Sequence, residues 1–464
     1  HPNAFYLRTR QRGMQNWDGK IHYITKTGQF KIGLLPKVYD MCIEMGIKPK
    51  VVDMRQPLPK VSKVVTNIGK YKLRPEQEKA VKAVINNKIG NTPFHIGVLD
   101  YTVNAGKTLI MSSLYLSYKK QLKTLLITND SDWLNQAREE FKQYLPGEDI
   151  TFVQGKVLNW SNFTIGMVQS ISRNMRFYQK ELSQIDMVLV DEADQGGSKQ
   201  YQNVITRLFN TRIRIGLSGT IYMSKLAKDK VKNMNLECFF GKVIAEFKLK
   251  DSIKKGYSTK TVVKMVPGKP WYGNWESDCI SYKEIYDDSI TNCYTAWLMA
   301  YNRLLWNLNQ GRYPALVVCK HIAHCENLYK FFKKKLGDAY NIAYVHVNTP
   351  SKLRQQIMKD FREGKIDILV STTIIARGKN FPKLRYLLNA ASMDSQEKSI
   401  QFLGRLVRTD KSKKKVYLDD LHYPGPYLDR HGKHRKQYYQ RQELKVILLD
   451  KLWKKHPNHS LIKS

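Results

Sequence analysis

The sequence predicts an α/β fold with two consecutive parallel-sheet units, a small α+β segment before them and a basic tail after them. The chain has 464 residues, more than one ordinary hydrophobic core accommodates. Short apolar runs alternate with amphipathic stretches, a pattern typical of strands that are buried between helices on both faces of a sheet. This alternation occurs in two separate series, so two sheets are expected.

The front of the chain, residues 1–66, does not share this alternation. Ile21–Thr25 and Phe30–Leu34 predict two short strands around a glycine-containing turn, which indicates a hairpin. Leu35–Met45 predicts a helix, and two prolines beyond it indicate a linker. We therefore expect a small α+β domain here.

The first alternating series predicts one sheet unit over residues 67–250. Its apolar runs are short and its amphipathic stretches follow the helical period. The expected strands are His95–Leu99, Leu125–Thr128, Phe163–Val168, Met187–Val190 and Ile213–Leu217, and the expected helices are Glu76–Asn86, Lys107–Lys120 and Asp132–Tyr144.

The second series predicts another sheet unit over residues 251–430, and residues 431–464 predict a basic tail. Pro267–Asp278 indicates a loop or an insertion, and Cys279–Asn309 a long helical stretch. The expected strands are Val262–Val266, Ala315–Cys319, Ala343–His346, Ile366–Val370, Tyr386–Ala390 and Lys415–Leu418.

The net charge favours a polyanionic partner. Lys and Arg total 78 against 40 Asp and Glu, which gives +38. Such an excess favours nucleic acid, because neutralising phosphates releases condensed counterions. An anionic membrane is not expected, since the chain shows no apolar run of about 20 residues, no basic amphipathic helix and no lipidation signal. Six scattered cysteines without a CxxC pair fit the reducing cytoplasm.

A phosphate-binding loop is predicted where the first strand of the series meets its helix. Asn104, Ala105 and Gly106 are small enough for backbone N–H groups to turn towards phosphate oxygens. Lys107 is expected to reach the β and γ phosphates of ATP, and Thr108 to hold Mg²⁺. The first glycine of the full motif is replaced by a tyrosine.

A run of acidic residues follows the strand Met187–Val190. Carboxylates at the carboxyl end of a parallel strand lie where such sheets bind ligands. We expect Asp191 to bind Mg²⁺, and Glu192 to orient the attacking water or to accept its proton. Ser218 and Thr220 follow the next strand, and their hydroxyls could hydrogen-bond these carboxylates and report the state of the nucleotide.

Two arginines, Arg405 and Arg408, lie three residues apart in a predicted helix, so they would share one face. Guanidinium groups aimed at a γ-phosphate stabilise the charge of the transition state. A surface helix that makes salt bridges is the alternative. In Cys319–Cys325 two cysteines and two histidines lie close together, but their spacing does not match a zinc site. A polar loop that contacts the DNA backbone is favoured there.

In this order the motifs resemble those of superfamily-two helicases, over roughly residues 71–420. Leu73–Gln77 resembles the adenine-reading Q motif, and Gln401–Arg408 resembles motif VI. The resemblance implies two tandem RecA-like domains. It also implies nucleotide contacts from Arg74, Gln77, Gly378 and Gln401, and DNA contacts from Thr128, Gln169, Lys320, His321, Ser371 and Thr372.

A closer resemblance is to the phage UvsW-like helicases, and a looser one to XPB-type translocases. It is carried by Asn104–Thr108, Gly216–Gly219, Cys319–His324 and Trp17–Ile21. It implies a cytoplasmic, monomeric motor that remodels branched or forked DNA by fork regression, junction migration and R-loop unwinding. It also implies that the front domain contacts duplex DNA, for which Arg8 and Arg12 are candidates. An ATP-dependent RNA helicase and a non-catalytic nucleic-acid-binding scaffold are the alternatives.

Overall fold

The computed structural model describes residues 18–118, 121–155, 159–221, 227–268, 281–376 and 381–449. The chain divides into two compact units, His1–Lys248 and Leu249–Ser464. Each unit contains one seven-stranded sheet whose strands are all parallel, so the structure has two tandem RecA-like units as predicted. No helix among the described residues is long and apolar enough to cross a membrane.

The sheet of the first unit has the strand order β11-β5-β10-β9-β6-β8-β7. All five predicted strands are present, and the four central ones are buried along their whole length because helices cover both faces. The edge strands β7 and β11 are half-exposed and were not predicted. The strands are β5 (Ile96–Tyr101), β6 (Thr124–Thr128), β7 (Ile150–Val153), β8 (Phe163–Met167), β9 (Met187–Asp191), β10 (Ile213–Ser218) and β11 (Val243–Phe247).

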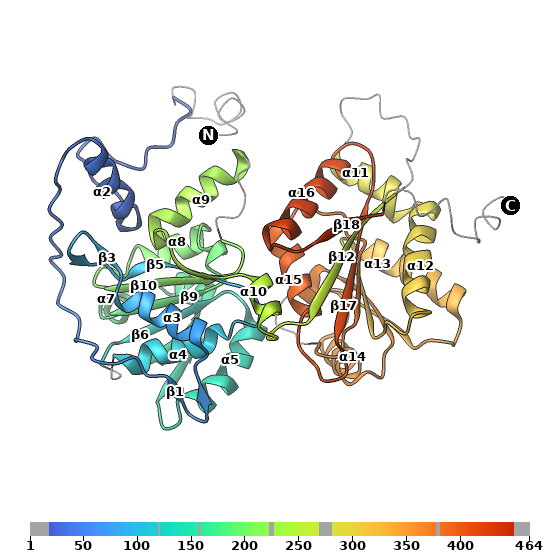
Figure 1. Ribbon diagram of the computed structural model, residues 1–464, viewed down its shortest axis with the longest axis horizontal. Helices are drawn as coiled ribbons and strands as arrows, with labels where there is room; N and C mark the ends of the chain where they lie inside the picture. Colours follow the sequence, from blue (N-terminus) through green and yellow to red (C-terminus); the bar gives the residue numbers. More distant parts are fainter. Residues whose placement is uncertain are drawn as a thin grey trace. The chain divides into compact units, whose positions relative to one another are not determined.

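Two groups of helices cover this sheet (Figure 1). One group consists of α3, α4 and α5, which pack side by side. The other group shares a hydrophobic core with the opposite face of the sheet. The first group is α3 (Pro75–Ile85), α4 (Lys107–Ser117) and α5 (Ser131–Tyr144), and the second is α6 (Val168–Arg173), α7 (Gln179–Ser183), α8 (Lys199–Ile205) and α9 (Ala227–Phe240).

The front segment packs against the first unit. Instead of the predicted hairpin, a single antiparallel bridge joins Ile24 and Phe30, and Ile32–Leu34 forms a 3-10 helix, η1, that leads into α2 (Leu35–Glu44). The second predicted strand was wrong because this segment packs on the end of α9, where a Cβ on Gly33 would lie 2.1 Å from a backbone oxygen. Two small hairpins follow, β1–β2 (Asn67–Ile68, Tyr71–Lys72) and β3–β4 (Lys88–Ile89, Thr92–Pro93).

The sheet of the second unit has the strand order β14-β15-β13-β16-β17-β12-β18. All six predicted strands are present, and β18 is an additional edge strand. The strands are β12 (Lys260–Pro267), β13 (Ala315–Cys319), β14 (Ile342–Val345), β15 (Ile368–Thr372), β16 (Tyr386–Asn389), β17 (Lys415–His422) and β18 (Val446–Leu448).

The predicted helical stretch Cys279–Asn309 is interrupted. It consists of α11 (Tyr282–Tyr286), a π-helical turn η3 (Asp287–Thr291) and α12 (Tyr294–Leu308). The predicted insertion at Pro267–Asp278 lies almost wholly outside the described residues. The remaining helices are α10 (Leu249–Lys254), α13 (Ile322–Leu336), α14 (Ser351–Glu363), η4 (Thr373–Ala376), α15 (Gln396–Leu406) and α16 (Leu428–Arg441).

The segment predicted as a basic tail from residue 431 is in part folded. Helix α16 packs on β17 and α15, and β18 extends the sheet beside β12. Arg435 is fully buried, with its Nε 2.9 Å from Oδ1 of Asp420, and Tyr439 donates to the same carboxylate at 2.7 Å. Burial works to lower the pKa of Arg435, but Asp420 outweighs it and raises that pKa. The basic segment from residue 431 therefore contains a residue, Arg435, that is buried in an ion pair with Asp420.

Replacing Arg435 with methionine is expected to lower the free energy of unfolding of the second unit by about 3–5 kcal/mol, because Asp420 stays buried without its countercharge. Urea unfolding followed by circular dichroism measures the loss. Arg430→Met, at an exposed position of the same helix, is the control and should change little. Equal stabilities of the two variants would show that the buried pair does not hold α16 in place.

Candidate active site

The predicted phosphate loop lies between β5 and α4. Asn104 and Gly106 adopt positive φ angles of 64° and 71°, and α4 begins directly afterwards at Lys107. Successive backbone amides in such a turn point into one concavity, and the helix N-terminus adds a favourable dipole for an anion. The local backbone therefore has the geometry of a phosphate cradle.

Three hydrogen bonds join the N-terminal end of α3 to this loop and to the strand end that precedes it. The Nε2 of Gln77 donates to the carbonyl of Ala105 at 2.8 Å, and Arg74 donates to the carbonyl of Asn104 at 3.0 Å. The hydroxyl of Tyr101, which replaces the motif's first glycine, donates to the carbonyl of Glu76 at 2.7 Å. Gln77 is only 1% exposed. In this structure Arg74 and Gln77, which the helicase resemblance implies as nucleotide contacts, support the backbone of the loop.

The loop lysine faces the acidic run. Lys107 Nζ lies 3.1 Å from Oδ1 of Asp191, a residue at the buried end of β9 that is 3% exposed. Burial works to lower the pKa of Lys107, but the carboxylates of Asp191, Glu192 and Asp194 together raise it above its ordinary value. Lys107 is therefore protonated across the neutral range, as a phosphate-binding lysine needs to be.

The hydroxyl residues at the end of β10 reach the same acidic run. Ser218 Oγ donates to Oδ1 of Asp194 at 2.9 Å, and the hydroxyls of Ser218 and Thr220 are 3.1 Å apart. The parallel register of β9 and β10 places Leu217 opposite Asp191, so the two strand ends are adjacent. The predicted bond from a hydroxyl to the carboxylates exists, and its acceptor is Asp194.

The oxygen donors here fit Mg²⁺. Among the described residues, no cluster of three or more His, Cys, Asp or Glu side chains could hold a metal by itself. Mg²⁺ does not need one, because it keeps several waters and binds through one or two protein oxygens and the substrate's phosphates. The hydroxyl of Thr108 and the carboxylate of Asp191, next to the phosphate loop, are donors of this kind.

Contrary to the prediction, Arg405 and Arg408 do not lie on one helix. Arg405 lies in the last turn of α15, but the helix ends at Leu406, so Arg408 is beyond it. The carbonyl of Arg408 accepts a hydrogen bond from Thr259 at 3.1 Å, which fixes the chain as it leaves the helix. Gln401 donates to Glu397 one turn earlier in α15 at 3.3 Å. Gly378 lies outside the described residues.

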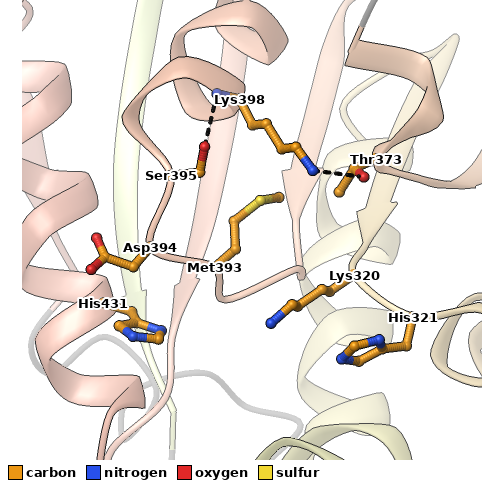
Figure 2. Close-up of a pocket in the computed structure, with 8 residues that line it drawn as sticks. All are labelled: Lys320, His321, Thr373, Met393, Asp394, Ser395, Lys398 and His431. Carbon is orange, nitrogen blue, oxygen red and sulfur yellow. Dashed lines mark hydrogen bonds between the residues drawn. The ribbon is translucent and has the colours of Figure 1, made fainter. Parts of the chain in front are cut away.

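A cavity of about 420 Å³ in the second unit gathers cationic side chains (Figure 2). Lys320 and His321 follow β13, and Lys398 comes from α15 with its Nζ 3.2 Å from the hydroxyl of Thr373. Burial and then the charge of Lys398 lower the pKa of Lys320. The cavity is also lined by Asp394, whose carboxylate accepts a hydrogen bond from Tyr438 and lies 3.0 Å from His434 Nδ1. Lys320, His321 and Lys398 are therefore the groups there that could meet a phosphate oxygen.

His324 and the two cysteines of the Cys319–Cys325 run belong to the core. His324 is buried and hydrogen-bonded to Tyr286 at 3.0 Å, and burial lowers its pKa to about 3. Cys319 and Cys325 are fully buried. Two half-buried residues of this run, Lys320 and His321, line the cavity.

Several residues that the resemblance implies as DNA contacts are not on the surface. Thr128 is 2% exposed and its hydroxyl accepts from the backbone N–H of Asp130 at 3.2 Å. Ser371 is fully buried and donates to the carbonyl of Thr372, itself a buried residue. Gln169 is half-buried at the start of α6. Arg8 and Arg12 lie outside the described residues.

Two residues near these sites, Gln195 and Lys398, were not singled out from the sequence. Asn129 and Gln195 form a hydrogen bond beside Glu192, and Lys398 and Thr373 line the cavity. Amides and single lysines occur throughout the chain, so only the positions of Gln195 and Lys398, just after the acidic run and at the start of the arginine-bearing helix, could have indicated them.

Two family models match the chain. Residues 70–223 match the model "Type III restriction enzyme, res subunit", and residues 298–410 match "Helicase conserved C-terminal domain". Together with the two parallel sheets, these matches show that the chain belongs to the superfamily-two helicases. Within that superfamily it is UvsW-like: the ATP-dependent DNA helicase uvsW of Enterobacteria phage T4 is 22% identical over 452 residues, which cover 88% of this chain and 82% of that protein.

Other relatives share shorter regions. Relatives from the Sulfolobus islandicus filamentous virus and from Saccharomyces cerevisiae are 22% and 23% identical over 385 and 377 residues, and the chain spans only 64% and 51% of their lengths. Matches to ATP-dependent RNA helicases also occur, over about a quarter of the chain. The DNA-bound restriction-modification enzyme LlaBIII shares the fold, with a TM-score of 0.60 at 13% identity over 82% of this chain and 31% of that one.

Proposed function

We propose that the chain is an ATP-driven DNA helicase or translocase that remodels branched or forked duplexes. The observation that carries the proposal is the pairing of Lys107 with Asp191 at 3.1 Å, between a phosphate cradle and the end of the neighbouring acidic strand. This arrangement supports ATP hydrolysis. The DNA part of the proposal is supported by similarity to a DNA helicase along 88% of the chain.

In the proposed reaction, water attacks the γ-phosphorus of ATP, a new P–O bond forms and the bond to the β,γ-bridging oxygen breaks. The leaving ADP takes the electron pair of the broken bond. A proton of the attacking water passes to Glu192, which we assign as the general base. Lys107 stabilises the charge on the β and γ phosphates. The products are ADP and phosphate, and Glu192 then returns the proton to solvent.

Magnesium, when bound, neutralises charge on the β and γ oxygens, and we propose that Thr108 and Asp191 hold it. Asp194 does not contact the metal in this scheme. Instead it links the acidic run to Ser218, and through Ser218 to Thr220, so the residues after β10 would sense changes at the nucleotide.

The second unit contributes in two ways to this proposal. We infer that Arg405 and Arg408 act on the γ-phosphate as arginine fingers. We also infer that the cavity around Lys320 and Lys398 holds a backbone phosphate of the nucleic acid. Backbone contacts carry no base information, so recognition should follow the structure of the DNA and not its sequence.

A panel of nucleic acids tests this function. We expect ATP turnover to rise with DNA, most strongly with forked or four-way junction DNA and less with linear duplex, while RNA duplex of equal length has little effect. Colorimetric phosphate release measures the rate, and gel separation of labelled strands measures remodelling. The monomeric state is checked by light scattering of the same sample.

The alternatives give different patterns in the same panel. Preferential stimulation by RNA would favour an RNA helicase, for which the acidic run Asp191–Asp194 and the shorter RNA-helicase matches are the supporting observations. Tight binding of junctions without any turnover would favour a non-catalytic scaffold.

A further inference from the structure

A row of hydrogen-bonded amide residues extends from the proposed general base, Glu192, towards the ends of the neighbouring strands. The sheet order places β6 beside β9, and β8 beside β6, so the residues that follow these three parallel strands meet at one edge of the sheet. Gln195 follows β9, Asn129 follows β6, and Gln169 lies just after β8. All three are half-buried.

Each member of this row bonds the next one. Gln195 Nε2 donates to Oε2 of Glu192 at 3.4 Å, and Gln195 Oε1 accepts a hydrogen bond from Asn129 Nδ2. The backbone carbonyl of Asn129 accepts from Gln169 Nε2 at 3.3 Å. Gln195 therefore uses both ends of its amide, and it connects Glu192 to Asn129 and, through the carbonyl of Asn129, to Gln169.

We propose that Gln195 is a positioning residue that restrains Glu192 until nucleic acid binds beside Asn129 and Gln169. The inference rests on the proposed function, because it assigns a regulatory role within the same hydrolytic site. In this proposal, nucleic acid is sensed in the first unit by Asn129, Gln169 and Gln195, and not by the nucleotide loop.

The physical reason is competition for one carboxylate. Glu192 must offer an oxygen to the attacking water, and a donor on Oε2 both lowers the basicity of that oxygen and turns it away. At 3.4 Å the bond is long, so a small displacement of Gln195 breaks it. Asn129 bonds the side-chain amide of Gln195, whose backbone is fixed by a 3-10 turn, so a movement of Asn129 would act on the side-chain bond to Glu192.

The nucleic-acid end of the row also has suitable chemistry. Amides can bond phosphate and sugar oxygens, which are the commonest contacts of proteins with DNA backbones. Helix α6, which carries Gln169, ends in the exposed Arg173, which supplies a cation to the same surface. A nucleic-acid backbone bound there would displace Gln169. Because Gln169 bonds the carbonyl of Asn129, the displacement would reach Asn129 and then Gln195.

The test compares ATP turnover without polynucleotide and with saturating forked DNA. Gln195→Met keeps the volume of the side chain and removes both amide bonds. Asn129→Asp keeps the shape and the backbone carbonyl, replaces the donor to Gln195 with an acceptor oxygen and adds a negative charge. Gln202→Met, in α8 of the same unit, is the matched control, since it removes a 2.8 Å bond from Gln202 to the carbonyl of Gly197.

We expect Gln195→Met and Asn129→Asp each to raise the DNA-free rate by roughly threefold to tenfold, which is the range of one ordinary hydrogen bond and suits a bond as long as 3.4 Å. The rate with saturating DNA and the KM for ATP should change little, so the stimulation ratio falls. The double variant should match the single variants, because both act on one bond network.

Other outcomes overturn the inference. A stimulation ratio equal to that of Gln202→Met, or an equal fall of both rates, would show that Gln195 is only structural. Asn129→Asp gives an independent decision if Gln195→Met does not fold, as judged by its melting curve. Absence of hydrolysis in the unmodified chain would overturn the proposed function itself, an outcome that differs from an unchanged ratio.

Discussion

Lys107→Ala is expected to lower ATP turnover by at least about a hundredfold, because the variant loses the cation that meets the developing charge on the transferred phosphate. In the structure this cation already lies 3.1 Å from Asp191, and three carboxylates keep it protonated. Binding of forked DNA, measured by fluorescence anisotropy without nucleotide, should remain within the range of the unmodified chain.

Two further variants make this prediction specific. Lys79→Ala removes an exposed lysine from α3 in the same unit and should retain full activity. Lys107→Arg keeps the charge but not the compact ammonium, so it should also be strongly impaired. DNA-stimulated hydrolysis that persists in Lys107→Ala would show that the loop 102–108 is not the phosphate site.

The central strands could be predicted because burial on both faces requires continuous apolar runs. Met187–Asp191 is an example, with every residue buried. The edge strands could not, since a half-exposed strand such as Val243–Phe247 tolerates an exposed glutamate. The strand β18 and the helix α16 were missed for a different reason. Their basic composition is typical of a solvated tail, and the carboxylate that neutralises Arg435 belongs to Asp420, fifteen residues earlier on β17.

The phosphate loop and the acidic run were predictable because each is local, a strand end followed by a few chemically distinct residues. Contacts between them required the strand order. The sequence alone does not state that β6 lies beside β9, so the bond from Asn129 to Gln195 could not be foreseen. Helix length was a second limit. Three-residue spacing predicts a shared face only while the helix continues, and α15 ends two residues before Arg408.

That helix end makes Arg405 the more informative of the two arginines. Its neighbours in α15, Leu403 and Leu406, are fully buried, so its backbone is fixed while its own side chain stays half-buried. Arg405→Ala is expected to lower kcat about a thousandfold, the lower end of the effect of an arginine finger. Affinity for ATP in the absence of turnover, measured with a fluorescent nucleotide, should change far less, since the guanidinium acts mainly in the transition state.

Two comparisons separate this role from simple electrostatics. Arg405→Lys keeps one positive charge but loses the planar fork, so it should recover little of the rate. Arg362→Ala removes an exposed arginine from α14 in the same unit and should leave kcat unchanged. If Arg405→Ala turned over ATP as fast as Arg362→Ala, the second unit would not supply the charge at the γ-phosphate, and its contribution would be limited to holding the nucleic acid.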